Sequence, residues 1–345
     1  RRLRMRGLMK SLLQSRHSWT HGLLPNSERR QRYDMTGNIK KREKKLRWKE
    51  CVPLYLMAVP GVIYMICNNY MPMFGILLAF KKLDVTKGIL GSPWHGFKNF
   101  EFLFKTKSTF QIIRNTVAYN VLFIILGTVI AVALAIFLNE IRSRIASRLY
   151  QTIILLPYII SWVIASYLVY AFLANDTGLV NNSIFSALGA KPVNWYMKPK
   201  YWPFILTFCF IWKSVGYTMI IYYSTIVGIS KDYYEAASID GATKWQQIKA
   251  ITLPLIKPTV ITMFLLAIGR IVSSDFGLFY QIPRNSGALY SVTQTLDVYV
   301  YNALMKNSDF AMSSAASVFQ SIVGFVFVMA ANALVRKNNA ESALF

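Results

Sequence analysis

Apolar stretches of bilayer-crossing length are the feature that most constrains this chain. Six of them follow residue 51, at about 52–80, 115–138, 152–174, 203–229, 258–281 and 310–335. Each is long enough to supply the roughly 20 residues that an α-helix needs to cross the hydrocarbon core. Because backbone groups inside a bilayer must find their hydrogen bonds within the protein, the sequence predicts an all-α polytopic membrane protein with six transmembrane helices.

Positive charge is concentrated before the first apolar stretch. The chain has 39 Lys and Arg against 15 Asp and Glu, which gives a net charge of +24. Residues 1–51 alone contain 16 basic and 4 acidic residues. So basic a chain would first suggest nucleic-acid binding. This distribution instead favours a basic tail that lies beside the inner face of a membrane.

Loop charges predict that both termini lie in the cytoplasm. With the N-terminus inside, cytoplasmic segments carry 25 Lys and Arg and external segments carry 11, although without the tail the balance is 9 to 11. The expected organisation is a basic cytoplasmic tail at 1–51, a six-span domain at 52–336 and a short cytoplasmic tail at 337–345. External segments are expected to include a short helix near 100–105, and a strand or an amphipathic helix late in 282–309.

A polar interval, residues 233–258, separates the fourth and fifth apolar stretches. Its sequence, YYEAASIDGATKWQQIKAITLPLIKP, indicates two short helices with a glycine joint. We expect Ser230 or Asp232 to cap the first helix and Glu235 to lie in its first turn, near the positive end of the helix dipole. Gly241 suits a change of chain direction without a Cβ penalty.

The second helix of this interval is expected over about 243–252, ended by Pro254. The interval resembles the EAA loop of ABC importer permeases, with Glu-Ala-Ala, three residues, Gly, nine residues and Ile-x-Leu-Pro. The spacer around Asp240 resembles the carbohydrate-importer version. The matching residues are Glu235, Ala236, Ala237, Asp240, Gly241, Ile251, Leu253 and Pro254. Stretches at 88–100 and 275–301 are similar to the complex-sugar subgroup of the maltose-type permeases, and the likeness covers roughly residues 50–340.

This resemblance implies a type I ABC importer permease fold and a function in ATP-driven uptake of oligosaccharides or polysaccharide fragments by alternating access. The implied partners are a related second permease subunit, two ABC ATPase subunits and an extracytoplasmic solute-binding protein that delivers the sugar. The EAA-type residues would couple the chain to the ATPase, which would use ATP and Mg; no cofactor is expected on this chain. The implied location is the bacterial cytoplasmic membrane.

No catalytic or metal-binding set stands out in the sequence. The three histidines, His17, His21 and His95, lie outside the apolar stretches and have no partner at ligand or triad spacing. A Gly-rich phosphate loop is also missing, so the chain is expected to be a transport subunit and not an enzyme. Two alternatives remain: an ABC permease for another solute, such as an anion or a peptide, and a membrane channel or enzyme of another class.

Three charged residues, Lys213, Arg270 and Asp275, lie inside apolar stretches. A charge near the bilayer centre costs a few kcal/mol or more unless it faces a cavity or a partner. They would therefore line a translocation path, form an interhelical ion pair of Lys213 or Arg270 with Asp275, or snorkel toward the headgroups. Arg270 and Asp275 are separated by roughly 140° around one helix, so a pair within the same helix is not expected.

Aromatic residues are abundant within the spans, and a sugar ring stacks its C–H face on an aromatic ring while its hydroxyls meet polar groups. Ordinary helix packing and interfacial aromatic belts are the competing explanation. The candidates for the substrate path are Asn120, Trp162, Tyr170, Trp212, Lys213, Tyr217, Arg270 and Asp275.

Overall fold

Helices make up the regular structure of the chain. The computed structural model describes residues 48–105 and 107–338, so most of the basic tail and the last part of the C-terminal tail lie outside the described residues. No named strand occurs among the elements of the described residues. The helices long and apolar enough to cross a membrane are Val52–Phe80, Ser108–Glu140, Pro199–Val227, Lys244–Ile268 and Phe310–Lys337. The expectation of an all-α membrane protein is confirmed.

The first span is a helical run that changes geometry along its length. It begins as α3 (Trp48–Met65), continues as a π-helix (Ile66–Tyr70) and ends as a 3-10 helix (Met71–Phe80). Pro72 lies just after the π segment, where its nitrogen has no hydrogen to donate to the preceding turn. Of the described residues, those up to Met73 belong to one compact unit and those from Phe74 onward to another.

In the unit from residue 74 onward, α6 (Lys107–Glu140) and α9 (Trp202–Val227) pack along each other. Small residues of α6 meet large residues of α9 in a buried cluster that includes Ala131, Ala135, Met219 and Tyr222. Small residues permit the close helix approach that stabilises helix pairs in lipid. Further helices, α12 (Leu253–Ile268) and α15 (Phe310–Asn338), pack against each other, and α12 also contacts α9.

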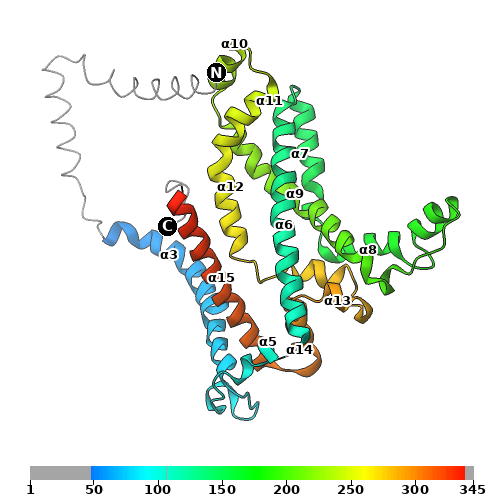
Figure 1. Cartoon of the computed structure of the whole chain (residues 1–345). Coiled ribbons are helices and arrows are strands. Elements are labelled where there is room, and N and C mark those ends of the chain that lie inside the picture. The colour runs from blue at the N-terminus through cyan, green and yellow to red at the C-terminus, as the bar shows by residue number, and fades with distance from the viewer. Residues whose placement is uncertain (1–47, 106, 339–345) are drawn as a thin grey trace. The chain divides into compact units, whose positions relative to one another are not determined.

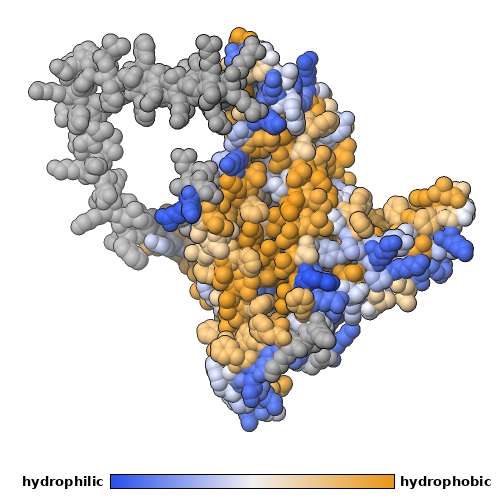
Figure 2. All heavy atoms as spheres, viewed as in Figure 1, coloured by the Kyte–Doolittle hydropathy of each residue, from blue (hydrophilic) through white to orange (hydrophobic). Residues whose placement is uncertain are grey.

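The outer surface of these helices is apolar. Figure 2 shows a broad hydrophobic surface over the middle of the face in view, with polar residues gathered toward its ends. Exposed side chains such as Ile125, Val129, Phe204 and Phe208 contribute to the apolar surface of α6 and α9. An exposed apolar surface of this kind is expected where lipid or another membrane subunit covers a protein.

The two ends of this unit carry different elements. In Figure 1, α10 (Lys231–Ile239) and α11 (Lys244–Gln247) lie at one end, and α5 (Phe102–Lys105) and α14 (Leu296–Asn307) lie at the other. The polar interval and the segments expected to be external are therefore at opposite ends. The short helix expected near 100–105 is present.

The segment 282–309 is helical, so its strand alternative is wrong. It contains the 3-10 turn Gly287–Leu289, α13 (Tyr290–Thr293) and α14. Within α14, Leu296 and Ala303 are buried, and Tyr299 and Val300 between them are partly buried. This spacing places one face of a helix, not of a strand, against the neighbouring elements.

The third span is broken, which corrects the expectation of one continuous helix over 152–174. It consists of α7 (Arg144–Ile159) and α8 (Trp162–Leu173), whose axes differ by 96°. Pro157 lies in the last turn of α7, and the side chain of Ser161 caps the first turn of α8. A proline beside a new N-cap gives the chain a defined place to bend.

The fifth span also differs from the expected 258–281. Its helix begins earlier, because α11, a π segment (Ile248–Thr252) and α12 form one run, Lys244–Ile268. Pro254 does not end this helix, because it lies in the first turn of α12, just after the π segment. The α-helix ends at Ile268, and a short π-helix (Gly277–Gln281) follows an irregular segment at 269–276.

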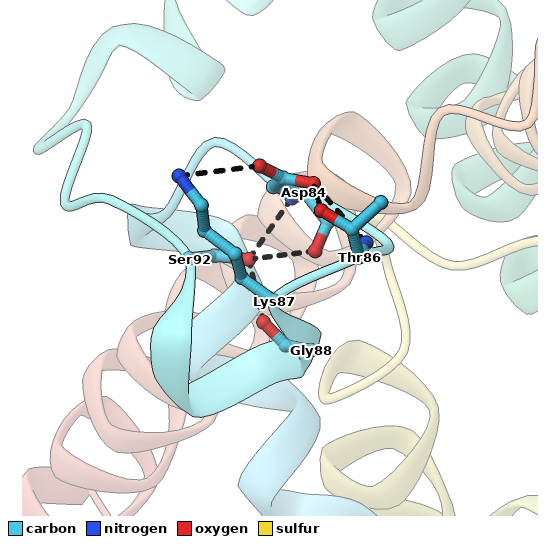
Figure 3. A network of polar contacts seen from close by, with 5 residues as sticks. All are labelled: Asp84, Thr86, Lys87, Gly88 and Ser92. Atoms are coloured by element: carbon cyan, nitrogen blue, oxygen red, sulfur yellow. Dashed lines mark hydrogen bonds and ion pairs between the residues drawn. The ribbon is translucent and has the colours of Figure 1, made fainter.

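A polar network closes the loop that follows the first span (Figure 3). The Asp84 carboxylate accepts hydrogen bonds from the Thr86 hydroxyl at 2.6 Å and the Thr86 backbone N–H at 3.1 Å, and it lies 3.6 Å from Lys87 Nζ. The Ser92 hydroxyl donates to the Gly88 carbonyl at 2.6 Å and accepts from the Asp84 N–H at 2.9 Å. The Thr86 hydroxyl, above all, holds the pKa of Asp84 below its ordinary value.

We predict that Asp84→Asn loosens this loop at neutral pH. A carboxylate with a depressed pKa contributes stability above its ordinary pKa, here 3.8, and loses it as the pH falls through the lower folded value. Hydrogen–deuterium exchange of the 82–93 peptide should therefore be faster in the variant, and in the wild type only at strongly acidic pH. Asp176→Asn, in another loop, is the matched control, and unchanged exchange in Asp84→Asn would contradict the assignment.

Candidate functional site

Gly241 is the joint of the polar interval. Its φ is +77°, a left-handed conformation that glycine adopts without strain, as expected from the sequence. The Ala242 N–H donates to the Ala237 carbonyl at 2.9 Å, and the Gly241 N–H donates to the Ser238 carbonyl at 3.1 Å. These two bonds form a Schellman motif, which ends α10 and reverses the chain. A Cβ at this position would meet nothing within 4 Å, so the requirement is conformational.

The first helix is capped by Ser230, whose hydroxyl accepts from the Asp232 N–H at 3.3 Å. Asp232, and not Glu235, is the acidic residue of the first turn, because α10 begins at Lys231. Glu235 therefore lies in the second turn, and the expectation that it lies in the first turn is wrong. Its side chain is exposed, and in the described part of the chain no hydrogen bond or ion pair involves it.

Side chains also fix the second helix against the first. Thr243 and Gln246 form a capping box, with bonds of 3.4 Å and 2.8 Å between each side chain and the other's backbone N–H. Gln247 is buried, and its amide donates to the Ser238 hydroxyl at 2.9 Å and to the Ala242 carbonyl at 3.3 Å. The angle between α10 and α11 is thus held by a buried side chain as well as by the glycine joint.

Side chains attach α10 and α11 to neighbouring elements at two points. Lys244 Nζ lies 3.2 Å from a carboxylate oxygen of Glu140, at the end of α6, and the Tyr234 hydroxyl lies 2.9 Å from the Thr252 hydroxyl. Three large apolar side chains of α10 and α11 are exposed: Tyr233, Ile239 and Trp245. An exposed apolar group rimmed by polar residues marks a contact surface for another protein.

The remaining residues of the EAA-type pattern are placed along this unit. Ala236 and Ala237 lie on α10, and Asp240 follows it as an exposed C-cap residue. Ile251 lies in the π segment, and Leu253 and Pro254 begin α12. The pattern therefore extends from the contact surface into the fifth span.

Lys213 binds the end of α7, where the third span breaks. It is buried on α9, and its ammonium donates to the carbonyl of Tyr158 at 2.8 Å and to that of Pro157 at 3.5 Å. These carbonyls belong to the end of α7, where the helix dipole gives them negative partial charge, and that of Pro157 also accepts from the Ile160 N–H at 3.3 Å. Among the described residues, no ion pair joins Lys213 or Arg270 to Asp275, so the intrachain ion-pair alternative is wrong.

The bend brings several expected path residues together. Trp162, the first residue of α8, donates its indole N–H to an Asp275 carboxylate oxygen at 2.8 Å. Lys213 Nζ lies 5.2 Å from the centre of the Trp162 ring and 5.5 Å from that of Tyr158. The Tyr158 ring stacks on Tyr217, with centres 4.8 Å apart. The cluster therefore contains an ammonium group, a carboxylate and three aromatic rings, which we call the bend cluster.

Side chains from two other helices hold the irregular segment of the fifth span. The Asn120 amide, on α6, donates to the carbonyls of Ile271 at 2.9 Å and Ser273 at 2.8 Å. The Gln320 amide, on α15, donates to the Val272 carbonyl at 3.0 Å. The structure thus places Asn120 as an anchor for unwound backbone at membrane depth.

The end of this segment is held by carboxylates. The Ser274 backbone N–H and hydroxyl both donate to an Asp297 oxygen, the hydroxyl at 2.8 Å, and the hydroxyl also lies 2.7 Å from that of Thr295. Asp275 caps the next helical turn by accepting from the Leu278 N–H at 3.3 Å. Asp275 therefore serves both the bend cluster and the start of the π-helix.

The other expected path residues lie apart from the bend cluster. Tyr170, on α8, has the Arg284 guanidinium carbon 4.2 Å from its ring centre. Trp212 and Arg270 are exposed, and in the part of the chain that the structure describes neither side chain makes a hydrogen bond, ion pair or ring contact. Sequence reasoning missed Tyr158; a proline with a serine four residues later was the available signal that the helix breaks beside it.

Comparison with known proteins adds a family and several relatives. Residues 124–339 match the family described as "Binding-protein-dependent transport system inner membrane component". The polygalacturonan/rhamnogalacturonan transport system permease protein YteP of Bacillus subtilis (strain 168) is 35% identical, and the match covers 84% of this chain and 89% of YteP. Protein LplB of the same organism is 31% identical, with 84% and 90% covered.

Two solved structures are similar over most of the chain. One is a bacterial ABC transporter involved in import of the acidic polysaccharide alginate, with a TM-score of 0.76, 32% identity, and 84% of this chain and 97% of that chain covered. The other is a bacterial alginate ABC transporter in complex with an alginate pentasaccharide-bound periplasmic protein, with a TM-score of 0.75, 31% identity and coverages of 84% and 96%. The fold and its membrane helices thus match a solved transporter.

We predict that Lys213→Met destabilises the protein, because it removes the ammonium that donates to the Tyr158 carbonyl at the end of α7. Losing a hydrogen bond to a buried group costs about 1–3 kcal/mol. Thermal unfolding of the purified protein in detergent should show a lower midpoint, with partial recovery in Lys213→Arg. Lys306→Met, at an exposed site on α14, is the matched control. An unchanged midpoint in Lys213→Met would rule out the capping role.

Proposed function

The chain belongs to the binding-protein-dependent transport system inner membrane component family, and from this we propose that it forms one half of an importer for oligosaccharide fragments of acidic polysaccharides. As a member of this family it is the permease subunit of an ABC importer and not an enzyme. The observation that carries the substrate assignment is the bend cluster, which meets a break in the fifth span. Broken helices near the midplane are where transporters of several families bind substrate.

The chemistry of the bend cluster suits a sugar. The rings of Trp162 and Tyr217 offer flat apolar faces for C–H groups, and the Asp275 carboxylate offers an acceptor for hydroxyls. Few, well-placed polar groups among aromatic side chains are typical of small-molecule sites. The names of the relatives support polysaccharide fragments over a peptide, because they transport polygalacturonan, rhamnogalacturonan or alginate.

The helix–glycine–helix unit is the proposed coupling surface. Tyr233, Ile239 and Trp245 would enter an apolar cleft of a cytoplasmic ABC ATPase, and the exposed Glu235 would meet a basic group there. ATP and Mg would be bound by two copies of that ATPase, and their closure would drive alternating access. The ion pair of Lys244 with Glu140 would keep the unit attached to α6 during this motion.

The proposed assembly places this chain in the bacterial cytoplasmic membrane beside a related second permease. An extracytoplasmic solute-binding protein would deliver the sugar at the end that carries α5 and α14, a role supported by the binding-protein-dependent family and by the alginate transporter solved with its periplasmic protein. The coupling unit at the opposite end would then be cytoplasmic, as would both termini.

We predict that Gly241→Asp and Glu235→Lys abolish sugar-stimulated ATP hydrolysis by the reconstituted transporter without removing the chain from the membrane. The first change forces a side chain into a left-handed backbone, and the second reverses the charge of the contact surface. Gly189→Asp is the matched control, because Gly189 has a φ of +65° in a loop far along the chain from the coupling unit. Wild-type stimulation in Gly241→Asp and Glu235→Lys would refute the coupling assignment.

The substrate proposal predicts which solutes stimulate the transporter. In proteoliposomes that contain both permeases and the ATPases, with the solute-binding protein present, uronate oligosaccharides should raise the rate of ATP hydrolysis several-fold. Peptides of similar size should leave it at the basal rate. Stimulation by peptides but not by any oligosaccharide would overturn the proposal.

A further inference from the structure

Lys213 and Arg270, the two basic residues considered for the substrate path, differ in burial and in hydrogen bonding. Lys213 is buried and its ammonium is occupied by two carbonyls at the end of α7. Arg270 is exposed, and among the described residues no partner meets its guanidinium. Resting on the proposed function, we propose that Arg270 is the residue that recognises the carboxylate groups of an acidic oligosaccharide, and that Lys213 is not.

The position of Arg270 supports a role in the translocation path. It lies two residues beyond Ile268, where the run Lys244–Ile268 ends, and before the π-helix Gly277–Gln281, at the break in the fifth span. The next two residues, Ile271 and Val272, are buried. The exposed arginine therefore lies at the start of the break, where the backbone leaves its helix.

The backbone around Arg270 is held in place on both sides. On one side, Gly269 packs so closely on α15 that a Cβ added to Gly324 would lie 2.4 Å from the Gly269 carbonyl oxygen. On the other side, Asn120 and Gln320 bind the carbonyls of the next residues. A guanidinium presented from a fixed backbone loses less freedom on binding, which favours selective recognition.

Among the residues that the structure describes, no carboxylate pairs with Arg270. Asp275 accepts from the Trp162 indole and caps the π-helix, and Asp297 accepts two hydrogen bonds from Ser274. An arginine that faced lipid at this depth would cost several kcal/mol. The side chain therefore faces a polar path or another subunit, and a carboxylate from outside the chain is the counter-ion of its guanidinium.

Arginine is well suited to this ligand. Its guanidinium stays protonated and presents a planar fork of donors that matches the two oxygens of a carboxylate. A uronate oligosaccharide carries one such carboxylate on each sugar, whereas a neutral oligosaccharide of equal length carries none. Recognition by Arg270 would thus separate acidic from neutral fragments within the same aromatic path.

The test uses the complete transporter in proteoliposomes with its solute-binding protein. For wild type, ATP hydrolysis is measured with oligogalacturonides and with their methyl esters, which keep the chain and remove the charge. Arg270→Gln should lower stimulation by the acidic form about tenfold or more and leave stimulation by the ester unchanged, since hydrogen bonds to charged groups are among the stronger ones. Arg148→Gln, at an exposed site on α7, is the matched control and should behave as wild type.

The outcomes separate this inference from the proposed function. Equal stimulation of Arg270→Gln and wild type by the acidic form overturns the role of Arg270 while import of sugars stands. If Arg270→Gln lowers stimulation by the acidic form and by the ester equally, the role of Arg270 in recognising carboxylates is also overturned, and a contact with the partner permease is indicated. If no oligosaccharide stimulates the wild type, the proposed function itself fails. If Arg270→Gln does not assemble, Arg270→Lys serves instead, because it keeps the positive charge and removes the planar fork of donors. Lower stimulation of ATP hydrolysis by the acidic form alone supports the inference, and unchanged stimulation overturns it.

Discussion

The constraint on which this structure depends is that irregular backbone inside a membrane must find its hydrogen bonds within the protein. Two spans are interrupted, and each interruption is satisfied by long polar side chains from neighbouring helices. Lys213 supplies the donors for the end of α7. Asn120 and Gln320 supply them for the break in the fifth span.

The breaks give the spans a polar interior that continuous helices would lack. The bend in the third span directs Trp162 toward Asp275, and Asp275 is available because the fifth span has already unwound before it. The two interruptions are therefore joined by one hydrogen bond between side chains. Of the polar groups along the apolar spans, Lys213 and Asn120 anchor backbone carbonyls, and Trp162 and Asp275 are members of the bend cluster.

The sequence predicted the features that depend on local pattern and missed those that depend on neighbours. The number of apolar stretches, the Ser230 cap and the glycine joint follow from period, capping and φ, and the structure bears them out. The broken spans do not follow from hydropathy, because a bent helix is as apolar as a straight one. Pro254 was misjudged because the π segment before it, set by tertiary packing, lets the helix continue.

That continuity has a mechanical consequence. Because α11, the π segment and α12 form one run from Lys244 to Ile268, the coupling surface and the break in the fifth span are the two ends of a single rod. A displacement of α11 by an ATPase would be passed along the rod to the break after Ile268, where side chains of α6 and α15 bind the carbonyls of Ile271 and Val272. Hydrogen bonds from side chains can change partners without unfolding a helix. A displacement that reaches the break would therefore rearrange Arg270 and Asp275.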